Sequence, residues 1–509
     1  MLKKIFIFIL VFSSLSCKKI LEEKAFSSLT VSSFFNNYKE ANQAVIGVYS
    51  QLPTPSYYKR NFTNVIGFLS DDAYNPGAAF TAFDDGTLEP TNNLVDGLWN
   101  SIFSLNGKAI FTISALENAE VLEAADKQLM LARVRFVRAL NLYNAVRLWG
   151  DIPLVKEYSV QEENLYPART PKSEVYAFIE EDLKYAMDIL PADEDEYGFP
   201  TKGAAMSLLA KIYLSQEKWA EANTTLDQVI GMNKYALLDN YMDVFDVKNE
   251  NNAEDIFSIQ FKKDQQEAAE NSAGSLLPFW FLPAFNGLGL AGNPDHPKGQ
   301  MRVEHATYDR YTTGDYTTDE RNEIFITSYP NSNNGNVVRR YPENKAAAAQ
   351  GPACIKYQDP TNDQDRNYDN NLYILRYADV LLMKAEAENE VKGPNSTAYN
   401  AFNLVRQRSN AKPLATGLSK DAFRDAVSME RGLEFYGEFQ SWFDQTRMKR
   451  SGDSYYKYYK TKVQSEGKFT HPSEARWAVY YPKLELMPIP SSELAINPNI
   501  TVANQNPGY

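Results

Sequence analysis

The sequence predicts a mainly α-helical protein, a tetratricopeptide-like scaffold of stacked helix pairs interrupted by one long loop-rich insertion. Apolar residues between Lys127 and Trp149 recur at intervals of three, four and seven, which supports the helices. A helix-pair motif near Leu209 supports the scaffold. Residues 264–371 break both patterns, since they are rich in Gly, Asn, Pro, Thr and Tyr and have little helical period. Long irregular segments in helical proteins are usually functional, so we expect this insertion to carry function.

The pattern of residues at the N-terminus predicts an export signal. An unbroken apolar run, Ile5–Phe12, follows Lys3 and Lys4 and precedes a serine-rich exit. A basic start, a short apolar core and small residues at the exit describe a secretory signal peptide. The run is far shorter than the ~20 residues that a bilayer-spanning helix needs. Residues 1–16 are therefore predicted to be removed on export and to take no part in the fold.

Cys17, directly after this signal, is the predicted site of lipid attachment. The segment resembles bacterial lipoprotein signals, in which a small-residue box ends at a cysteine that becomes the lipid-bearing first residue of the mature chain. It departs from them at Ser14, where such signals usually carry a large apolar residue. A soluble periplasmic protein with an incidental Cys17 is the alternative. Residues 17–33 are polar, and we expect them to form the lipidated N-terminal tether.

Residues 34–263 form the predicted N-terminal helical-repeat region. Amphipathic patterns predict helices around Phe34–Leu52, Leu98–Ala119 and Lys127–Trp149. Thr170 and Pro171 are expected to open the next helix, as a capping residue followed by proline at the first helical position.

The helix-pair motif lies at the end of this region. Leu209, Ala210 and Tyr213 match one helix of a tetratricopeptide repeat, and Ala222 and Leu226 match the returning helix. The small residues allow two antiparallel helices to approach closely, while the large ones fill the space beside them. Pairs of this kind stack into a superhelical scaffold.

Residues 264–509 form the predicted C-terminal region, which begins with the insertion 264–371. A second helix pair with a weaker match is expected at Leu372–Val391 and Ser396–Ser409. The chain ends in "LMPIPSSELAINPNITVANQNPGY", where three prolines disfavour a regular helix and predict an extended strap.

Two aromatic groups are the candidate ligand-binding residues. The first comprises Tyr74, Asn75, Phe80 and Phe83 in an early loop; the second comprises Phe279 and Trp280 in the insertion. Aromatic rings stack on the apolar face of a sugar, and the indole N–H of tryptophan can also donate to a hydroxyl. For the second group, buried packing of an irregular region is an equally good interpretation.

Composition argues against several classes of function. The chain has 509 residues and a formal charge of −13, and the predicted signal removes two lysines and no acid. Such an acidic chain lacks the basic footprint of a nucleic-acid binder. Two cysteines and three separated histidines offer little material for a zinc site or for histidine-based chemistry. We therefore predict no nucleic-acid partner, no metal and no cofactor.

Three glutamates could suggest an enzyme. Glu430, Glu434 and Glu438 lie four apart, hence on one helix face. Glycoside hydrolases instead use two carboxylates ~5–9.5 Å apart across a cleft, usually from different elements. A charge network with Arg431 and Arg447 that holds the scaffold is the better interpretation, and no catalytic residue is predicted.

The segment "DPTNDQDRNYDNN" has the acidic spacing of a calcium loop at Asp363, Asp365 and Asn367. It lacks the glycine expected at the sixth position, which is Tyr368, and the glutamate expected at the twelfth, which is Ile374. We interpret it as a solvated loop, and a calcium site of another geometry stays open.

Several segments together resemble the SusD/RagB family of outer-membrane lipoproteins, over nearly all of the mature chain. In order, they are "CKKILEEKAFSSLT", "LWNSIFSLNGKAI", "VRFVRALNLYNAVRLWGDIPLV", "TKGAAMSLLAKIYL", "ILRYADVLLMKAEAENE", "ERGLEFYGEFQSWFDQTR" and "PIPSSELAINPNI…QNPGY". The resemblance implies a non-enzymatic, lipid-anchored receptor on the outer membrane. It also implies delivery of oligosaccharides, or of peptides in some members, to a SusC-like TonB-dependent transporter, and ligand contacts from loops in the two aromatic regions.

The acidic pair Glu22–Glu23 resembles the tag that sends such lipoproteins to the cell surface, displaced here by Lys18 and Lys19. We therefore expect the protein to face the cell exterior. Three alternatives stay open: a peptide-binding receptor of the same system, a surface glycoside hydrolase, and a scaffold that binds only protein.

Overall fold

The computed structural model describes residues 35–70, 72–75, 80–159, 166–263, 273–344, 351–362, 364–458, 461 and 483–509. The fold is mainly α-helical, which confirms the predicted class. Cys17, the predicted signal and the whole of the predicted tether 17–33 lie outside the described residues. Among the described helices, none is both long enough and apolar enough to cross a membrane.

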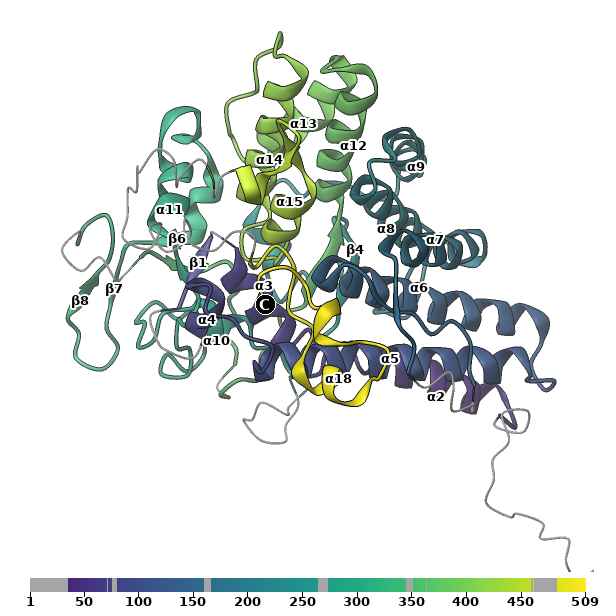
Figure 1. The fold of residues 1–509 in the computed structure, drawn as a ribbon. Coiled ribbons are helices and arrows are strands. Elements are labelled where there is room, and N and C mark those ends of the chain that lie inside the picture. The colour runs from purple at the N-terminus through teal and green to yellow at the C-terminus, as the bar shows by residue number, and fades with distance from the viewer. Residues whose placement is uncertain are drawn as a thin grey trace, which may run out of the picture.

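A stack of antiparallel helices forms the scaffold (Figure 1). Its members are α5 (Asn93–Glu117), α6 (Ala124–Trp149), α7 (Lys172–Ile189), α8 (Lys202–Ser215), α9 (Trp219–Gly231), α12 (Tyr377–Lys392) and α13 (Ser396–Arg408). Each packs on the next along this order. The predicted pair is α8 and α9, where Ala210 and Ala222 are fully buried, so the small residues permit the close approach expected of them.

The loop-rich insertion leaves the stack between α9 and α12, two helices that pack on each other although far apart in sequence. Strand β4 (Asp255–Ile259) pairs antiparallel with β10 (Leu372–Arg376), so the chain departs and returns side by side. The second predicted helix pair therefore needs a correction at its start. Leu372–Arg376 is a strand, because its backbone bonds β4, and the helix begins at Tyr377.

The insertion itself contains short elements, seen beside β7, β8 and α11 in Figure 1. They are α10 (Leu277–Phe281), β5 (Arg302–Val303), α11 (His305–Thr312), η5 (Gly314–Tyr316), η6 (Glu320–Ile324), β6 (Phe325–Ile326), β7 (Ser328–Pro330), β8 (Val337–Arg339) and β9 (Ala353–Cys354). The strands form two-stranded pairs, β5 with β1 (Ala73–Tyr74), β6 with β9 and β7 with β8. Such short pairs expose many loop ends, which suits a region that presents side chains to a partner.

The remaining elements frame the stack. They are α2 (Tyr38–Tyr49), α3 (Asn61–Leu69), β1 (Ala73–Tyr74), α4 (Thr81–Asp84), β2 (Ile152–Pro153), β3 (Arg169–Thr170), η4 (Met242–Phe245), α14 (Lys420–Glu434), α15 (Ser441–Arg447), β11 (Lys449–Arg450), β12 (Asp453–Ser454), α18 (Ser491–Ile496) and η7 (Val502–Asn504). Helix α2 packs on α5 and α6, and α3 packs on α5. One continuous hydrophobic core joins these helices to the insertion.

A second boundary prediction, the start of the helix after Thr170, is wrong for a local reason. Helix α7 begins at Lys172, because Thr170 is held opposite Ile152 in the β2–β3 pair and cannot cap the helix. The backbone N–H of Lys172 instead donates to Asp151 Oδ1 over 2.7 Å.

The C-terminal tail crosses the end of α6 but is not wholly extended (Figure 1). The indole N–H of Trp149 donates to the carbonyl of Pro488 over 3.0 Å, and Asn506 Nδ2 donates to the carbonyl of Trp149 over 3.0 Å. Helix α18 forms within the tail directly after Pro490. Proline is compatible with this position, since the first turn of a helix does not use its backbone N–H groups.

Candidate functional site

The two predicted aromatic groups meet in one buried cluster. Phe80 stacks on Phe68 with ring centroids 4.8 Å apart, and its ring lies 6.1 Å from that of Trp280. Phe279 lies edge-on to Trp280 at 4.9 Å. Phe83, from α4, is buried as well. Packing between α3, α4 and α10 therefore brings together residues that are distant in the sequence.

Burial supports the packing interpretation for the second group. Trp280 is only 4% exposed, so the expectation of a solvent-facing sugar platform is wrong for this side chain. Among the described residues, no acceptor lies within hydrogen-bond distance of its indole N–H. Phe285, 37% exposed, is the ring from the same segment that reaches solvent. A ligand contact by Phe279 or Trp280 stays a prediction.

Tyr74 and Asn75 lie at the edge of the insertion and are also buried. Tyr74 sits on β1 directly opposite Arg302 of β5. Its hydroxyl accepts a hydrogen bond from the backbone N–H of Gly351 over 2.9 Å. Burial raises the pKa of Tyr74 above its ordinary value. The hydroxyl therefore stays protonated at physiological pH.

Two arginines join Tyr74 at this corner, and sequence reasoning did not single them out. Arg302 Nε donates to the carbonyl of Gly299 over 3.1 Å. Arg340, directly after β8, donates from Nη1 to the carbonyl of Gly351 over 3.1 Å and from Nη2 to the Tyr329 hydroxyl over 3.0 Å. We call Tyr74, Arg302, Tyr329 and Arg340 the arginine corner. Two-residue strands create it, and no periodic pattern in the sequence announces strands that short.

Half-buried aromatic rings flank this corner on α11 and the segment after β8. Tyr341 stacks on His305 with ring centroids 4.2 Å apart and lies 6.1 Å from the ring of Tyr308. The Tyr341 hydroxyl donates to both carboxylate oxygens of Asp309, over 3.0 and 2.9 Å. Rings beside a carboxylate and guanidinium groups supply the stacking surfaces and polar partners that a sugar needs.

The three glutamates of the C-terminal region form a buried charge network, as predicted. The ion pairs are Glu430 with Arg321 (2.6 Å) and Arg406 (2.7 Å), Glu434 with Arg321 (2.9 Å), Arg376 (2.6 Å) and Arg408, and Glu438 with Arg376 (2.8 Å) and Lys356 (2.6 Å). Burial opposes ionisation of Glu434, yet Arg408, Arg376 and Arg321 together hold its pKa well below its usual range. These carboxylates are committed to guanidinium and ammonium partners and do not face a cleft.

Arg431 and Arg447 were expected to pair with these glutamates, and this prediction is wrong. Arg431 pairs with Asp379 and Asp444, at 2.8 Å each, and Arg447 pairs with Glu386 at 2.6 Å. They form a second buried cluster beside the first. Helix spacing identified which face carries charge, but not which residues from other elements meet it.

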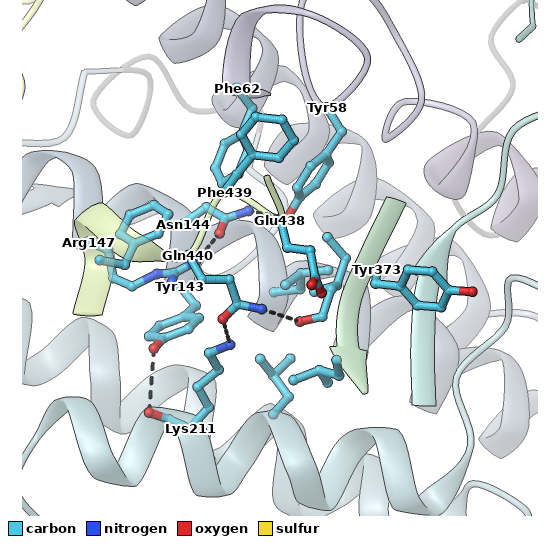
Figure 2. A pocket seen from close by; sticks show the side chains of 15 residues that line it. Tyr58, Phe62, Tyr143, Asn144, Arg147, Lys211, Tyr373, Glu438, Phe439 and Gln440 are labelled. Atoms are coloured by element: carbon cyan, nitrogen blue, oxygen red, sulfur yellow. Dashed lines mark hydrogen bonds between the residues drawn. The ribbon is translucent and has the colours of Figure 1, made fainter. Parts of the chain in front are cut away.

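A polar cavity next to this cluster is too small for a ligand (Figure 2). Figure 2 shows Lys211 pointing at Gln440, with Tyr143, Asn144 and Arg147 around them. The volume is about 30 Å³, which is one water molecule's share of liquid water. A sugar ring does not fit in such a space, so this cavity belongs to the scaffold.

A larger concavity lies on another face, between α2, the segment 196–199 and β4. One part measures about 340 Å³ and is lined by Ile46, Tyr49 and Phe199, among others. An adjoining part of about 170 Å³ is more polar and is bordered by Asp255. Tyr197, 73% exposed, stands at both. The volume of the larger part of this concavity lies at the lower end of the range for known ligand pockets.

The acidic loop before β10 is held by its own hydrogen bonds. Asp359 Oδ1 accepts from the Thr361 hydroxyl over 2.8 Å, and Asn367 Oδ1 accepts from the backbone N–H of Gly274 over 3.1 Å. Asn367 is fully buried, so the expectation of a solvated loop is wrong at this residue. Asp363 lies outside the described residues, and within the described ones no group of three His, Cys, Asp or Glu is placed to hold a metal.

The architecture defines a helical-repeat protein with a separate loop-rich face. Residues 231–509 match the family described as "SusD family", and residues 20–214 match the one described as "Starch-binding associating with outer membrane". The first match spans more than half of the chain, and the chain belongs to the SusD family.

Some relatives match over most of their length and one over about a quarter. A SusD-like protein of Formosa agariphila is 26% identical over 98% of this chain and 98% of its own. A SusD-like protein of Bacteroides ovatus is 27% identical over 76% of this chain and 71% of its own. The starch-binding protein SusD of Bacteroides thetaiotaomicron is 28% identical over 27% of this chain and 25% of its own.

Solved structures share the fold. A SusD homolog from Bacteroides thetaiotaomicron has a TM-score of 0.80 at 24% identity and covers 96% of this chain and 100% of its own. The surface glycan-binding protein A of the same species, in complex with laminarihexaose, has a TM-score of 0.72 at 22% identity and covers 92% of this chain and 99% of its own.

Proposed function

We propose that this protein is a lipid-anchored outer-membrane lipoprotein that binds oligosaccharides at the cell surface and delivers them to a SusC-like TonB-dependent transporter. The observation that carries the proposal is the family match along nearly the whole chain, with one matched family described as starch-binding and associating with the outer membrane. One relative named for starch and a fold neighbour in complex with laminarihexaose support the choice of ligand.

The structure supports the placing of the ligand on the loop-rich face. There the arginine corner and the half-buried rings of Tyr308 and Tyr341 offer polar and aromatic partners. We propose that Tyr74 belongs to this site and that Asn75, Phe80, Phe83, Phe279 and Trp280 support it from beneath. We propose no catalytic activity, since the carboxylates that invited that interpretation are held in buried ion pairs.

Calorimetric titration with oligosaccharides and peptides tests the binding role. We expect a carbohydrate ligand, and no new reducing ends after prolonged incubation with it. Binding of peptides in place of every carbohydrate would favour the peptide-receptor alternative. New reducing ends would favour a hydrolase.

The lipid anchor is tested by Cys17→Ala. We expect the variant to leave the membrane fraction, because stable anchoring needs several acyl chains and these depend on the cysteine. A variant that still partitions with membranes like the wild type would place the anchor elsewhere.

The delivery role requires a partner. We expect the protein to co-purify with a TonB-dependent barrel after mild detergent extraction. Recovery of the protein alone, with the barrel intact in the same extract, would count against import. A stable barrel complex without any carbohydrate affinity would favour the scaffold alternative.

A further inference from the structure

The arginine corner differs from every other buried charge cluster described above. Arg302 and Tyr74 face each other across the β1–β5 pair, and Arg340 reaches the same place through Gly351, whose N–H donates to Tyr74. Arg340 is almost fully buried and Arg302 is half-buried. Two cationic side chains from separate elements therefore lie near enough to influence each other, Arg302 bonded to the carbonyl of Gly299 and Arg340 to that of Gly351.

Within the described part of the chain no carboxylate forms an ion pair with either arginine, and the nearest acidic influence on the corner is the buried Glu304, which acts on Tyr74. The partners of Arg340 are a carbonyl and a tyrosine hydroxyl, both neutral, and its Nε is buried without a partner. Burial, followed by the nearby charge of Arg340, lowers the pKa of Arg302. Burying a charge without a counter-charge is costly, and like charges add to that cost. An anion at this corner would relieve both.

Arg302 has its binding groups free for such an anion. Its Nε is anchored to the carbonyl of Gly299, which fixes the direction of the guanidinium. Its two Nη groups form no hydrogen bond with the described residues, and the side chain as a whole is only partly buried. A guanidinium held at Nε with both Nη groups open is arranged for bidentate contact with an oxyanion.

We propose that Arg302, backed by Arg340, binds the acidic group of an anionic oligosaccharide. The inference rests on the proposed glycan-binding function and narrows its ligand class to sugars that carry a uronate carboxylate or a sulfate ester. Both groups present two or three oxygens to a guanidinium fork. The rings of Tyr308 and Tyr341, on neighbouring elements, provide faces for the adjoining sugars.

The overall charge of −13 does not oppose this assignment. At physiological ionic strength, charges are screened beyond a Debye length of about 8 Å, so an anion at the corner responds mainly to the two nearby guanidinium groups. The acidity elsewhere has a separate effect, since it keeps polyanions without a matching sugar from adsorbing broadly.

Calorimetric titration of the full-length protein with three probes tests the proposal: tetragalacturonate, a sulfated carrageenan tetrasaccharide and neutral laminarihexaose. We expect at least one acidic probe to bind more tightly than the neutral one, and the better acidic probe to show whether carboxylate or sulfate is the natural group. Arg302→Gln should weaken acidic binding about tenfold to a hundredfold, the range for hydrogen bonds to charged groups, and leave neutral binding unchanged.

Arg339→Gln is the matched control. Arg339 is the preceding neighbour of Arg340, is exposed and pairs with Glu343, so its loss should not change affinity for any probe. Arg302→Lys keeps the charge but not the fork, and should fall between the wild type and Arg302→Gln. If a melting curve shows that Arg302→Gln does not fold, the proposal is tested instead by Arg302→Lys and by the preference of the wild type among the three probes.

The outcomes separate this inference from the function on which it rests. Tight binding of laminarihexaose with neither acidic probe bound would overturn the anionic class and leave glycan binding intact. Binding of none of the three, nor of any other carbohydrate, would overturn both. If Arg339→Gln and Arg302→Gln lose the same affinity for the acidic probes, the effect is one of general electrostatics. Arg302 would then form no specific binding site. Preference for an acidic hexapeptide over both acidic sugars would also overturn it.

Discussion

Buried charges are arranged in opposite ways at two places in this molecule. Where α12, α14 and α15 meet, each buried arginine of the network has carboxylate partners, and Arg376 alone contacts three glutamates. At the arginine corner, Arg302 and Arg340 have neutral partners within the described residues. The two places also differ in their framework, since most residues of the first lie on helices, while strands of two or three residues build the second.

The difference separates scaffold from site. A paired ion deep in the interior has its field cancelled by its neighbours, and what it contributes is the alignment of the helices that carry it. An unpaired cation at the surface of a loop-rich region keeps its field directed outward, where a ligand can meet it. The pairing of a buried charge is thus a more useful guide to function in this chain than its burial.

Removal of Glu434 should have the largest effect on stability. Glu434→Gln keeps the shape of the side chain but leaves Arg321, Arg376 and Arg408 short of a counter-charge. We expect a loss of roughly 3–5 kcal/mol in the free energy of unfolding, measured by urea denaturation. A loss below about 1 kcal/mol would mean that the network contributes no more than a surface pair.

The same network gives a pH dependence. The folded-state pKa of Glu434 is depressed, so its contribution to stability is complete above its ordinary value of 4.5 and is lost as the pH falls toward the folded value. As the pH is lowered below 5, the free energy of unfolding should therefore fall by more in the wild type than in Glu434→Gln. Parallel acid unfolding curves would contradict this.

Trp280→Ala should have the next largest effect on stability. The side chain is buried among Phe80 and Phe279, so a loss of about 3–4 kcal/mol is expected. We place it in the lower part of the range for such truncations, because the variant also removes an indole N–H that has no acceptor among the described residues. A melting curve measures the loss, with Trp280→Phe as a milder control. Unchanged stability with lost sugar affinity would restore the platform interpretation.

Asp255 offers the converse of the arginine corner, a carboxyl group without a cation among the described residues. Burial raises its pKa to about 7, although the Ser258 hydroxyl donates to it over 2.7 Å. The folded state therefore holds the proton more tightly than the unfolded one, and the stability from this group is full below about pH 4 and declines as the pH rises to 7. Asp255→Asn should gain on the order of 1 kcal/mol at pH 8 and little at pH 4. Denaturation at both pH values measures it, and an equal effect at the two would be the contrary result.

The exposed pair of Lys412 and Asp315 should matter least. Its atoms lie 2.8 Å apart, but both side chains are mostly exposed. Asp315→Ala should change the free energy of unfolding by less than about 1 kcal/mol in the same urea experiment as Glu434→Gln. A loss as large as that of Glu434→Gln would show that burial does not separate the two classes of ion pair.

The sequence was informative wherever a local pattern sets the structure. Helical periodicity located α5, α6 and the α8–α9 pair, and four-residue spacing put the three glutamates on one face. It could not give their partners, because Glu434 meets Arg321 and Arg376 across separations of 113 and 58 residues. The prediction of a helix over Leu372–Arg376 was also wrong, because pairing with β4 overrides the helical spacing there.

The candidate site was less predictable for the same reason. Tyr74 could be chosen as an aromatic residue in an early loop, but its contact with Gly351 spans 277 residues. Arg302 and Arg340 carry no motif, and only the closing of the short strand pairs brings them together. Aromatic content alone also does not separate a stacking surface from a core. The sequence therefore left both interpretations of Trp280 open, and the structure buries this side chain.

A crystal structure of the protein soaked with tetragalacturonate or the sulfated tetrasaccharide, whichever binds more tightly, tests the central claim most directly. The account predicts an acidic group of the ligand within hydrogen-bond distance of both Nη atoms of Arg302, with a sugar ring on the loop-rich face. A ligand seated elsewhere, for example in the concavity beside Tyr197, with Arg302 untouched, would contradict it.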